Sequence, residues 1–310
     1  MKTPRFAFPL FLTGSAMLSA GPIFVRVADV GVLQSAFWRL ALAVPLLYAL
    51  ARVMERAAPL LPPRGSVPWL FLAGFFFAAD LAAWHLGIVR TELANAALLG
   101  NAAAFLFPIW GYLVARRWPT PVAVLALALA AVGIGMLMGD SASVSGEHLF
   151  GDLLCFIAAV FYTGYLVVMG RARGGLSAMA TLAPVTLAGA ICLLPVALIA
   201  PGNVWPQDWT PVILLALGSQ VVGQGLIIYA LPHLTPLASG VGLLIQPVFA
   251  ALLGYLWFEE ILSVTDFAGI AILFVAILLV RRPSAAQPPV EKRVPPGGGA
   301  VTPPGEAPSA

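Results

Sequence analysis

Hydrophobic residues occupy most of the first 282 positions and form long blocks that contain few polar residues. A helix rises about 1.5 Å per residue, so about 20 apolar residues cross the hydrocarbon of a bilayer. The blocks have this length and predict ten spans, roughly 6–27, 33–53, 67–89, 93–115, 120–138, 150–170, 178–199, 209–230, 234–257 and 264–281. The short alternating strands of a membrane barrel do not occur, so the pattern predicts an all-α integral membrane protein.

Composition agrees with a lipid environment. The chain is 61% hydrophobic and 9% charged, whereas a soluble domain has about 25% charged residues. The partner expected from composition is therefore the lipid bilayer, and the features described below add a small-molecule substrate. No basic patch suggests nucleic acid, and a homodimer is left open. Cys155 and Cys192 lie inside apolar blocks and are best explained as packing residues, so no disulfide, metal site or cofactor is expected.

The first apolar block also has the appearance of a signal peptide, because Lys2 and Arg5 precede it and "MLSAGP" lies within it. The apolar run continues to Val27, which is longer than a typical signal core. We therefore expect a retained span.

The distribution of charge predicts the orientation. With a cytoplasmic N-terminus, the predicted inner loops hold most basic residues and the outer loops hold mainly acidic ones. The inner set is Lys2, Arg5, Arg52, Arg56, Arg64, Arg116, Arg117, Arg171, Arg173, Arg281, Arg282, Lys292 and Arg293. Ten spans place both termini in the cytoplasm. The absence of organelle signals favours a bacterial inner membrane.

The two halves of the chain resemble each other. "TELANAALLGN" at 91–101 compares with "TPLASGVGLLIQ" at 235–246, and "GYL" recurs at 111–113 and 254–256. Five spans per half is an odd number, so the second half would enter the membrane inverted relative to the first. The predicted domains are a first five-helix repeat at 6–138 and a second at 150–282. The Pro/Gly-rich segment 283–310 is predicted to be a disordered cytoplasmic tail.

Four segments carry a family resemblance: "FWRLALAVPLL" (37–47), "DLAAWHLGIVRTELANAALLGN" (80–101), "GDLLCFIAAVFYTGYLVVMGRA" (151–172) and "LLIQPVFAALLGYLWFEEILS" (243–263). In this order across ten spans, the chain resembles the EamA-type family of the drug/metabolite transporter superfamily, over about residues 10–282. The resemblance implies a ten-helix inverted-repeat transporter with a central cavity lined mostly by spans one to four and six to nine. The chain departs from the family pattern at Ala104, where proline is common, and at Arg116 and Arg117, where an acid is frequent.

Asp80 lies near the middle of the third predicted span. A charged aspartate at this depth costs about 2.5–3.5 kcal/mol on insertion scales, so it should face the interior of the bundle. A low dielectric disfavours the carboxylate, which suits a group that binds and releases a proton. The alternative is a structural acid that joins two helices. Trp84 shares the face of Asp80. His85 lies about 140° around the helix from Asp80, and proton transfer and helix packing are equally favoured as its role.

The internal repeat extends the set of candidates to the eighth span. Adding 144 to Asp80 gives Gln224, and adding it to His85 gives Tyr229. Gln220 lies four residues before Gln224 and shares its face. These uncharged counterparts suggest one charged binding locus, and amide hydrogen bonding between helices is the structural alternative.

The fourth and ninth spans add further polar candidates. Asn95 and Asn101 differ by about 240° on an ideal helix, so both face one cavity only if the helix is interrupted. Pro247 removes a backbone donor beside Gln246, and the freed carbonyls would be available to a substrate. A plain proline kink is the alternative.

Arg39 and two tyrosines complete the candidate set. Arg39 lies near the outer end of the second predicted span, and a gating or structural role is favoured for it. The alternatives are that it attracts an anionic substrate or pairs with Asp80. Tyr162 and Tyr165 are candidate cavity hydroxyls or interface anchors.

These features favour a secondary active transporter, most simply an exporter of a small polar metabolite, amino acid or drug-like compound, with protons as the expected coupling ion and Asp80 as their carrier. A passive facilitator with a structural Asp80 and a membrane scaffold are the alternatives. The chain has no P-loop and no H-E-x-x-H motif, and we expect no catalytic residues.

Overall fold

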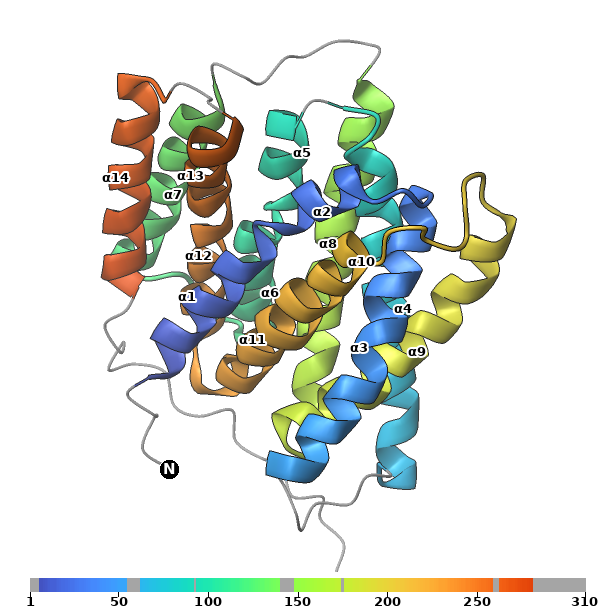
Figure 1. Cartoon of the computed structure of the whole chain (residues 1–310). Helices are drawn as coiled ribbons and strands as arrows, with labels where there is room; N and C mark the ends of the chain where they lie inside the picture. Colours follow the sequence, from blue (N-terminus) through green and yellow to red (C-terminus); the bar gives the residue numbers. More distant parts are fainter. Residues whose placement is uncertain are drawn as a thin grey trace, which may run out of the picture.

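The structure is a computed structural model that describes residues 6–54, 62–91, 93–139, 148–173, 176–258 and 262–280. The described part is helical and contains no strand. The predicted tail at 283–310 lies outside the described residues. Figure 1 shows a bundle of long, tilted helices, in which the first described helix begins and the last one ends on the left side of the view.

The helices follow the apolar blocks of the sequence, because each block buries its backbone hydrogen bonds within itself. Their bounds are α1 Ala7–Leu18, α2 Gly21–Val27, α3 Val32–Met54, α4 Val67–Gly87, α5 Leu93–Gly100, α6 Ala103–Ala115, α7 Pro121–Gly139, α8 Leu149–Ala172, α9 Ala178–Ile199, α10 Thr210–Leu214, α11 Gly225–Ala230, α12 Pro236–Leu243, α13 Ile245–Phe258 and α14 Val264–Val280. The π-helical segment η2 (Leu215–Gln224) joins α10 to α11, and the short 3-10 turns η1 (Arg64–Ser66) and η3 (Leu231–His233) precede α4 and follow α11.

Eight of these helical stretches are long and apolar enough to cross a membrane. Two shorter apolar helices, Pro121–Leu137 and Val264–Val280, coincide with the fifth and tenth predicted spans. The prediction of an all-helical membrane protein is therefore confirmed for the described residues. The count of ten crossings and the inversion of the two halves stay predictions.

Three of the spans are broken near their middle. The first breaks between α1 and α2, where the Ser19 hydroxyl donates to the Ala16 carbonyl at 2.6 Å and Pro22 supplies no N–H to continue the ladder. The fourth breaks at Asn101, before α6, and the ninth at Leu244, between α12 and α13. The eighth span is continuous but wound as the π-helix η2 over ten residues. Such interruptions mark functional regions in many helical proteins.

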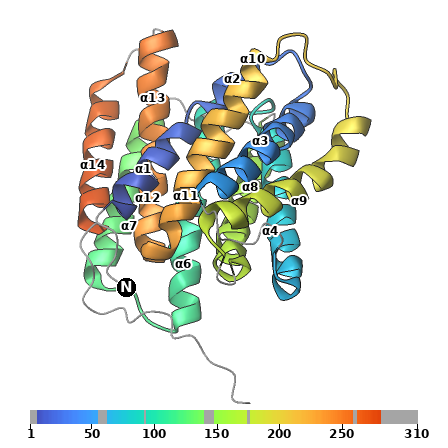
Figure 2. The same cartoon turned by 60° about the horizontal axis from the view of Figure 1, so that its bottom comes forward.

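Helices from the two halves pack closely. Helix α4 lies along α8 and α9, α3 lies along α9, and α7 lies along α14. Figures 1 and 2 both show α7 beside α14 at one edge of the bundle. Glycine makes this approach close: a Cβ at Gly133 would lie 3.0 Å from the carbonyl oxygen of Gly269. Small residues at helix crossings favour association in lipid.

The start of α3 and the end of α9 are joined through loops. The carboxylate of Asp29 accepts the backbone N–H groups of Gln207 and Asp208 at 2.8 and 3.1 Å, and Trp38 donates its indole N–H to the Val204 carbonyl at 2.7 Å. The backbone N–H of Thr210 donates to Asp208 and holds the pKa of that carboxyl below its usual range. This network keeps the loop before α10 in place.

Candidate functional site

A cavity opens where the broken helices meet the middle of α4 and α8. Its empty space totals about 890 Å³, open mouth included. It is lined by Leu18, Ser19, Pro22, Arg39, Phe77, Asp80, Leu81, Trp84, Ile88, Ala96, Ala97, Gly100, Asn101, Ala103, Tyr162, Gln224, Leu243, Gln246, Pro247 and Ala250. The lining therefore comes from both halves of the chain.

Asp80 contributes the acidic group of this cavity. It lies on α4 and is only 9% exposed, and it has no hydrogen-bond partner among the described residues. Trp84, one helical turn further along α4, lines the same wall. A buried carboxylate is ordinarily paired or hydrogen-bonded, so an unpartnered one that faces a cavity indicates a binding group.

Arg39 contributes the basic group. It lies on α3, is 4% exposed, and has its guanidinium carbon 5.8 Å from the ring centroid of Phe77. Phe77 in turn stacks on Tyr165, with ring centroids 4.6 Å apart. No ion pair within 4.0 Å joins Arg39 to Asp80, although both side chains are described. The aromatic face partly compensates the buried cation. The Nε of Arg39 is buried without a partner, whereas the two terminal nitrogens of the guanidinium are not enclosed.

Gln224 of η2 and Tyr162 of α8 also line the cavity, and Gln224 bonds to a second tyrosine of α8, Tyr165. Its Nε2 donates to the Tyr162 hydroxyl at 3.3 Å, and its Oε1 accepts the Tyr165 hydroxyl at 3.4 Å. Gln224 and Tyr165 are fully buried, and Tyr162 lines the cavity. The amide is therefore held in one orientation by hydroxyls on both of its ends.

The breaks of the fourth and ninth spans bring Asn101, Gln246 and Pro247 to the cavity. Asn101 follows α5 and donates its Nδ2 to the Ala97 carbonyl at 2.7 Å, which caps the end of α5. The side chain of Asn95 lies outside the described residues.

Three candidates lie away from the cavity. His85 is buried against α3, with Nδ1 3.0 Å from the Ser35 hydroxyl and 2.9 Å from the Val32 carbonyl. Gln220 donates to the Thr186 hydroxyl of α9 at 3.0 Å, and Tyr229 is 40% exposed. The structure places the first two in helix packing and the third on the surface.

Ser19, Pro22 and Phe77 line the cavity but were not among the candidates predicted from the sequence. The signal for the first two lay in "LSAGP", where a glycine–proline pair interrupts an apolar block. No feature of the sequence distinguished Phe77, because it is one of three consecutive phenylalanines. Which of them faces the cavity depends on how the helix is rotated about its axis.

The cavity lining combines a few hydrogen-bonding and ionic side chains with mostly apolar ones. Among the described residues, no cluster of three His, Cys, Asp or Glu could hold a metal ion. The arrangement suits reversible binding of a solute within a membrane-embedded bundle, which defines the class of membrane transporters.

Comparison with known proteins agrees with the resemblance predicted from the sequence. Residues 149–282 match the EamA-like transporter family, and the resemblance is confirmed for this part of the chain. The pseudopaline exporter CntI of Pseudomonas aeruginosa (strain UCBPP-PA14) is 25% identical over 257 residues, which cover 79% of this chain and 84% of the relative. A solved crystal structure has a similar fold, with a TM-score of 0.71 at 16% identity, and the match covers 89% of this chain and 98% of the other.

Proposed function

We propose that this chain is a secondary active exporter of a small polar metabolite, amino acid or drug-like compound, that the cavity is its binding site, and that Asp80 is its proton-coupling group. The observation that carries the proposal is the unpartnered Asp80 carboxylate in a cavity lined by both halves of the chain. Export as the direction draws on the resemblance to a relative that is named as an exporter.

The architecture proposed is two five-helix repeats related by a two-fold axis in the membrane plane. Under this relation the third and sixth spans should pack as the eighth and first do. Helix α4 packs along α8, and α1 packs along η2 and α11. The second, fourth and fifth spans should meet their own counterparts, and the pairs α3 with α9, α6 with α12 and α7 with α14 are in contact. These pairings support the inverted repeat.

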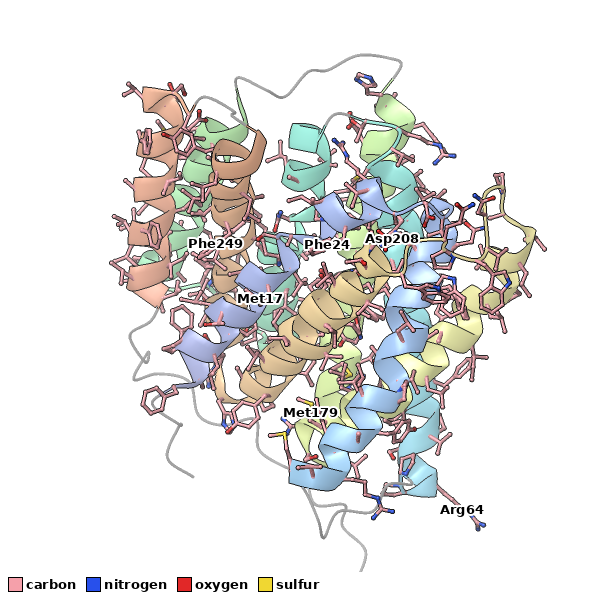
Figure 3. The ribbon with its side chains drawn as sticks, viewed as in Figure 1. Met17, Phe24, Arg64, Met179, Asp208 and Phe249 are labelled. Carbon is pink, nitrogen blue, oxygen red and sulfur yellow. The ribbon has the colours of Figure 1, made fainter. Side chains whose placement is uncertain are left out.

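The proposed orientation puts both termini in the cytoplasm of a bacterium, with the protein in the inner membrane. Figure 3 supports it, because Arg64 lies at the lower end of the bundle and Asp208 lies in the upper half. Among the described basic residues expected inside, Arg52 and Arg171 lie in the last turns of α3 and α8.

The described conformation has its cavity directed toward the outer end. The lining follows α4 from Phe77 to Ile88, beyond the outer end of that helix. Toward the proposed cytoplasmic side, Phe11, Leu166 and Ile227 are buried members of the apolar core. Under this proposal, transport requires the core to open on that side while the outer ends close.

In such a cycle, Asp80 would couple movement of the substrate to movement of protons. A charged carboxylate is costly in a cavity closed to water on both sides, so the closed state favours an Asp80 that is neutralised by a proton or by a cationic group of the substrate. Exchange of one for the other would link export to proton entry.

The test begins with untargeted metabolite profiling of cells and medium, with the gene deleted and overexpressed. The exported compound is then placed at equal concentration inside and outside proteoliposomes that contain the purified protein, and a pH gradient is imposed. We expect accumulation against the concentration gradient, lost on addition of an uncoupler. Movement only down the concentration gradient would assign the chain to the passive facilitators. If no compound is transported, the chain would be assigned to the membrane scaffolds.

A further inference from the structure

The end of α6 projects from the bundle, on the side that the proposed orientation places in the cytoplasm. The chain is exposed without interruption from Leu113 in the last turn of α6 to Trp118. Leu113 is 70% exposed, and Trp118, at 94%, is the most exposed large apolar side chain in the part of the chain that the structure describes. Figure 2 shows this end of α6 standing clear of the helices beside it. Apolar side chains in such a position contact lipid rather than protein.

Arg116 ends α6 in a left-handed backbone conformation, with φ 50° and ψ 42°. Among the described residues, it is the one residue other than glycine with a positive φ. Glycine is the usual residue at such a helix end, because a Cβ makes this conformation unfavourable.

The cap itself does not require the arginine side chain. The backbone N–H of Arg116 donates to the Leu113 carbonyl at 3.2 Å, and that of Arg117 donates to the Tyr112 carbonyl at 3.3 Å. These bonds satisfy the end of the helix with backbone groups alone. A strained residue whose side chain is not needed by the fold indicates a function for that side chain.

The positive charge of Arg116 is not balanced within the described protein. Its side chain makes no hydrogen bond or ion pair with another described residue. The described carboxylates lie elsewhere, either in the cavity or beside the starts of α3, α8, α10 and α14, and they are Asp29, Asp80, Asp152, Asp208 and Asp266. Arg117 places a second positive charge next to the first. The partner of this charge is therefore an anion from outside the protein.

A phospholipid supplies all the contacts that this segment offers. A guanidinium matches a phosphate group with two parallel hydrogen bonds, and tryptophan favours the interface between the hydrocarbon and water. Leu113 precedes Arg116 by three residues, or about 4.5 Å along the helix. The leucine therefore reaches the acyl chains when the arginine lies among the headgroups.

The adjacent charges also select the kind of headgroup. A zwitterionic headgroup carries an ammonium that already compensates its phosphate, whereas an anionic headgroup leaves its charge for the protein. Two neighbouring arginines therefore favour an anionic lipid.

We propose that residues 113–118 bind an anionic phospholipid of the cytoplasmic leaflet, with its phosphate on Arg116 and Arg117, its glycerol region against Trp118 and an acyl chain along Leu113. The choice of leaflet rests on the proposed orientation. The binding itself goes beyond the proposed transport function and does not depend on it.

The test measures which lipids lie beside Trp118. The purified protein is reconstituted in phosphatidylcholine vesicles that contain a minor fraction of phosphatidylglycerol with brominated acyl chains, which quench tryptophan fluorescence on contact. The same fraction of brominated phosphatidylcholine supplies the reference. Trp118→Phe changes only an exposed ring, so the difference in quenching between wild type and this variant isolates the signal of Trp118.

The quantity obtained is the preference, defined as the ratio of the association constants of phosphatidylglycerol and phosphatidylcholine beside Trp118. We expect a preference of about 5- to 30-fold, as one or two basic residues near an anionic headgroup provide. Added salt should lower it, because both arginines are exposed.

Two variants assign the preference to the arginines. Arg116→Gly removes the guanidinium and also relieves the left-handed backbone, so the protein should unfold in detergent no more readily than wild type, while the preference falls about 5-fold. Arg116→Gly combined with Arg117→Gln should bring it to about 1. The matched control is Arg52→Gln combined with Arg64→Gln, which removes the same charge from two exposed arginines of the proposed inner side and should keep the preference.

Each contrary outcome is decisive. A preference near 1 in the wild type, or one that persists without both arginines, would overturn the lipid site. An equal fall in the control pair would overturn it too, because the attraction would then belong to the whole basic side of the protein. If Arg116→Gly destabilises the protein and keeps the preference, the arginine is structural and the site is overturned. The proposed export would stand in all these cases, since metabolite profiling tests it separately.

Discussion

Replacing Gln224 with alanine tests whether the amide that bridges two tyrosines serves both the fold and the cavity. The change removes two hydrogen bonds, at 3.3 Å to Tyr162 and 3.4 Å to Tyr165. Both are long for neutral groups, so each contributes about 0.5–1 kcal/mol. The hydroxyl of Tyr165, which is fully buried, loses its partner at a cost of about 1–2 kcal/mol.

The lost methylene adds about 0.8 kcal/mol, so Gln224→Ala should lower the free energy of unfolding by about 3–5 kcal/mol. Because Gln224 also lines the cavity, the affinity for the exported compound should fall as well. Reversible unfolding in mixed micelles, followed by tryptophan fluorescence, measures the first quantity. Binding to the purified protein in nanodiscs measures the second.

Gln220 provides a matched control on the same π-helical segment. It is also fully buried, but it makes one hydrogen bond, to Thr186 at 3.0 Å, and its Oε1 already has no partner. The buried Thr186 hydroxyl loses its partner, but removal of the unpartnered Oε1 offsets that cost. The lost hydrogen bond and methylene then make Gln220→Ala cost about 1–2 kcal/mol, and affinity should be unchanged. An equal loss of affinity in both variants would refute the assignment of Gln224 to the cavity and of Gln220 to helix packing. An unchanged free energy of unfolding for Gln224→Ala would show that its hydrogen bonds to the tyrosines do not stabilise the fold.

Asp80→Asn should fold normally, because asparagine has the size of aspartate and is uncharged, yet transport in proteoliposomes should no longer respond to an imposed pH gradient. An unaltered pH response would remove Asp80 from coupling. Gly14→Leu should lower stability by about 1–3 kcal/mol, since a Cβ there would lie 2.7 Å from a carbonyl oxygen of η2; Gly218→Ala, with open space around it, should melt near the wild type, and equal melting of both variants would contradict the packing. In a cysteine-free background, a cysteine replacing Asp208 should react with an impermeant maleimide in intact cells, and one replacing Arg64 only after permeabilisation; the reverse pattern would overturn the proposed orientation.

The apolar blocks were sufficient to predict the helices. A stretch of about 20 apolar residues has few alternatives in lipid, because only a helix satisfies its backbone within the segment. The predicted spans therefore agree with the described helices to within a few residues at most ends, and α7 and α14 fall where the fifth and tenth spans were expected. The breaks inside the first and ninth spans were less visible, since one helix and two half-helices have almost the same composition.

The candidate residues show the same division between local and tertiary information. Asp80 was singled out by its depth in an apolar block, and the structure places it in the cavity with Trp84 and Gln224. His85 and Gln220 carried similar signals, yet both bond to neighbouring helices instead. Which face of a helix turns inward depends on its partners, and a nearly uniform apolar sequence records that poorly.

The sequence by itself determined that the chain is a helical membrane protein, roughly where its helices run and that a carboxylate lies deep within one of them, because hydrophobic length and the cost of a buried charge are properties of short segments. The assembly of α1, α3, α4, α8 and the broken fourth and ninth spans around one cavity was decided by the tertiary structure alone. That assembly leaves Arg39 and Asp80 in the same space without pairing them. Their separation depends on the rotation and spacing of whole helices, which arise from packing between segments distant in the chain.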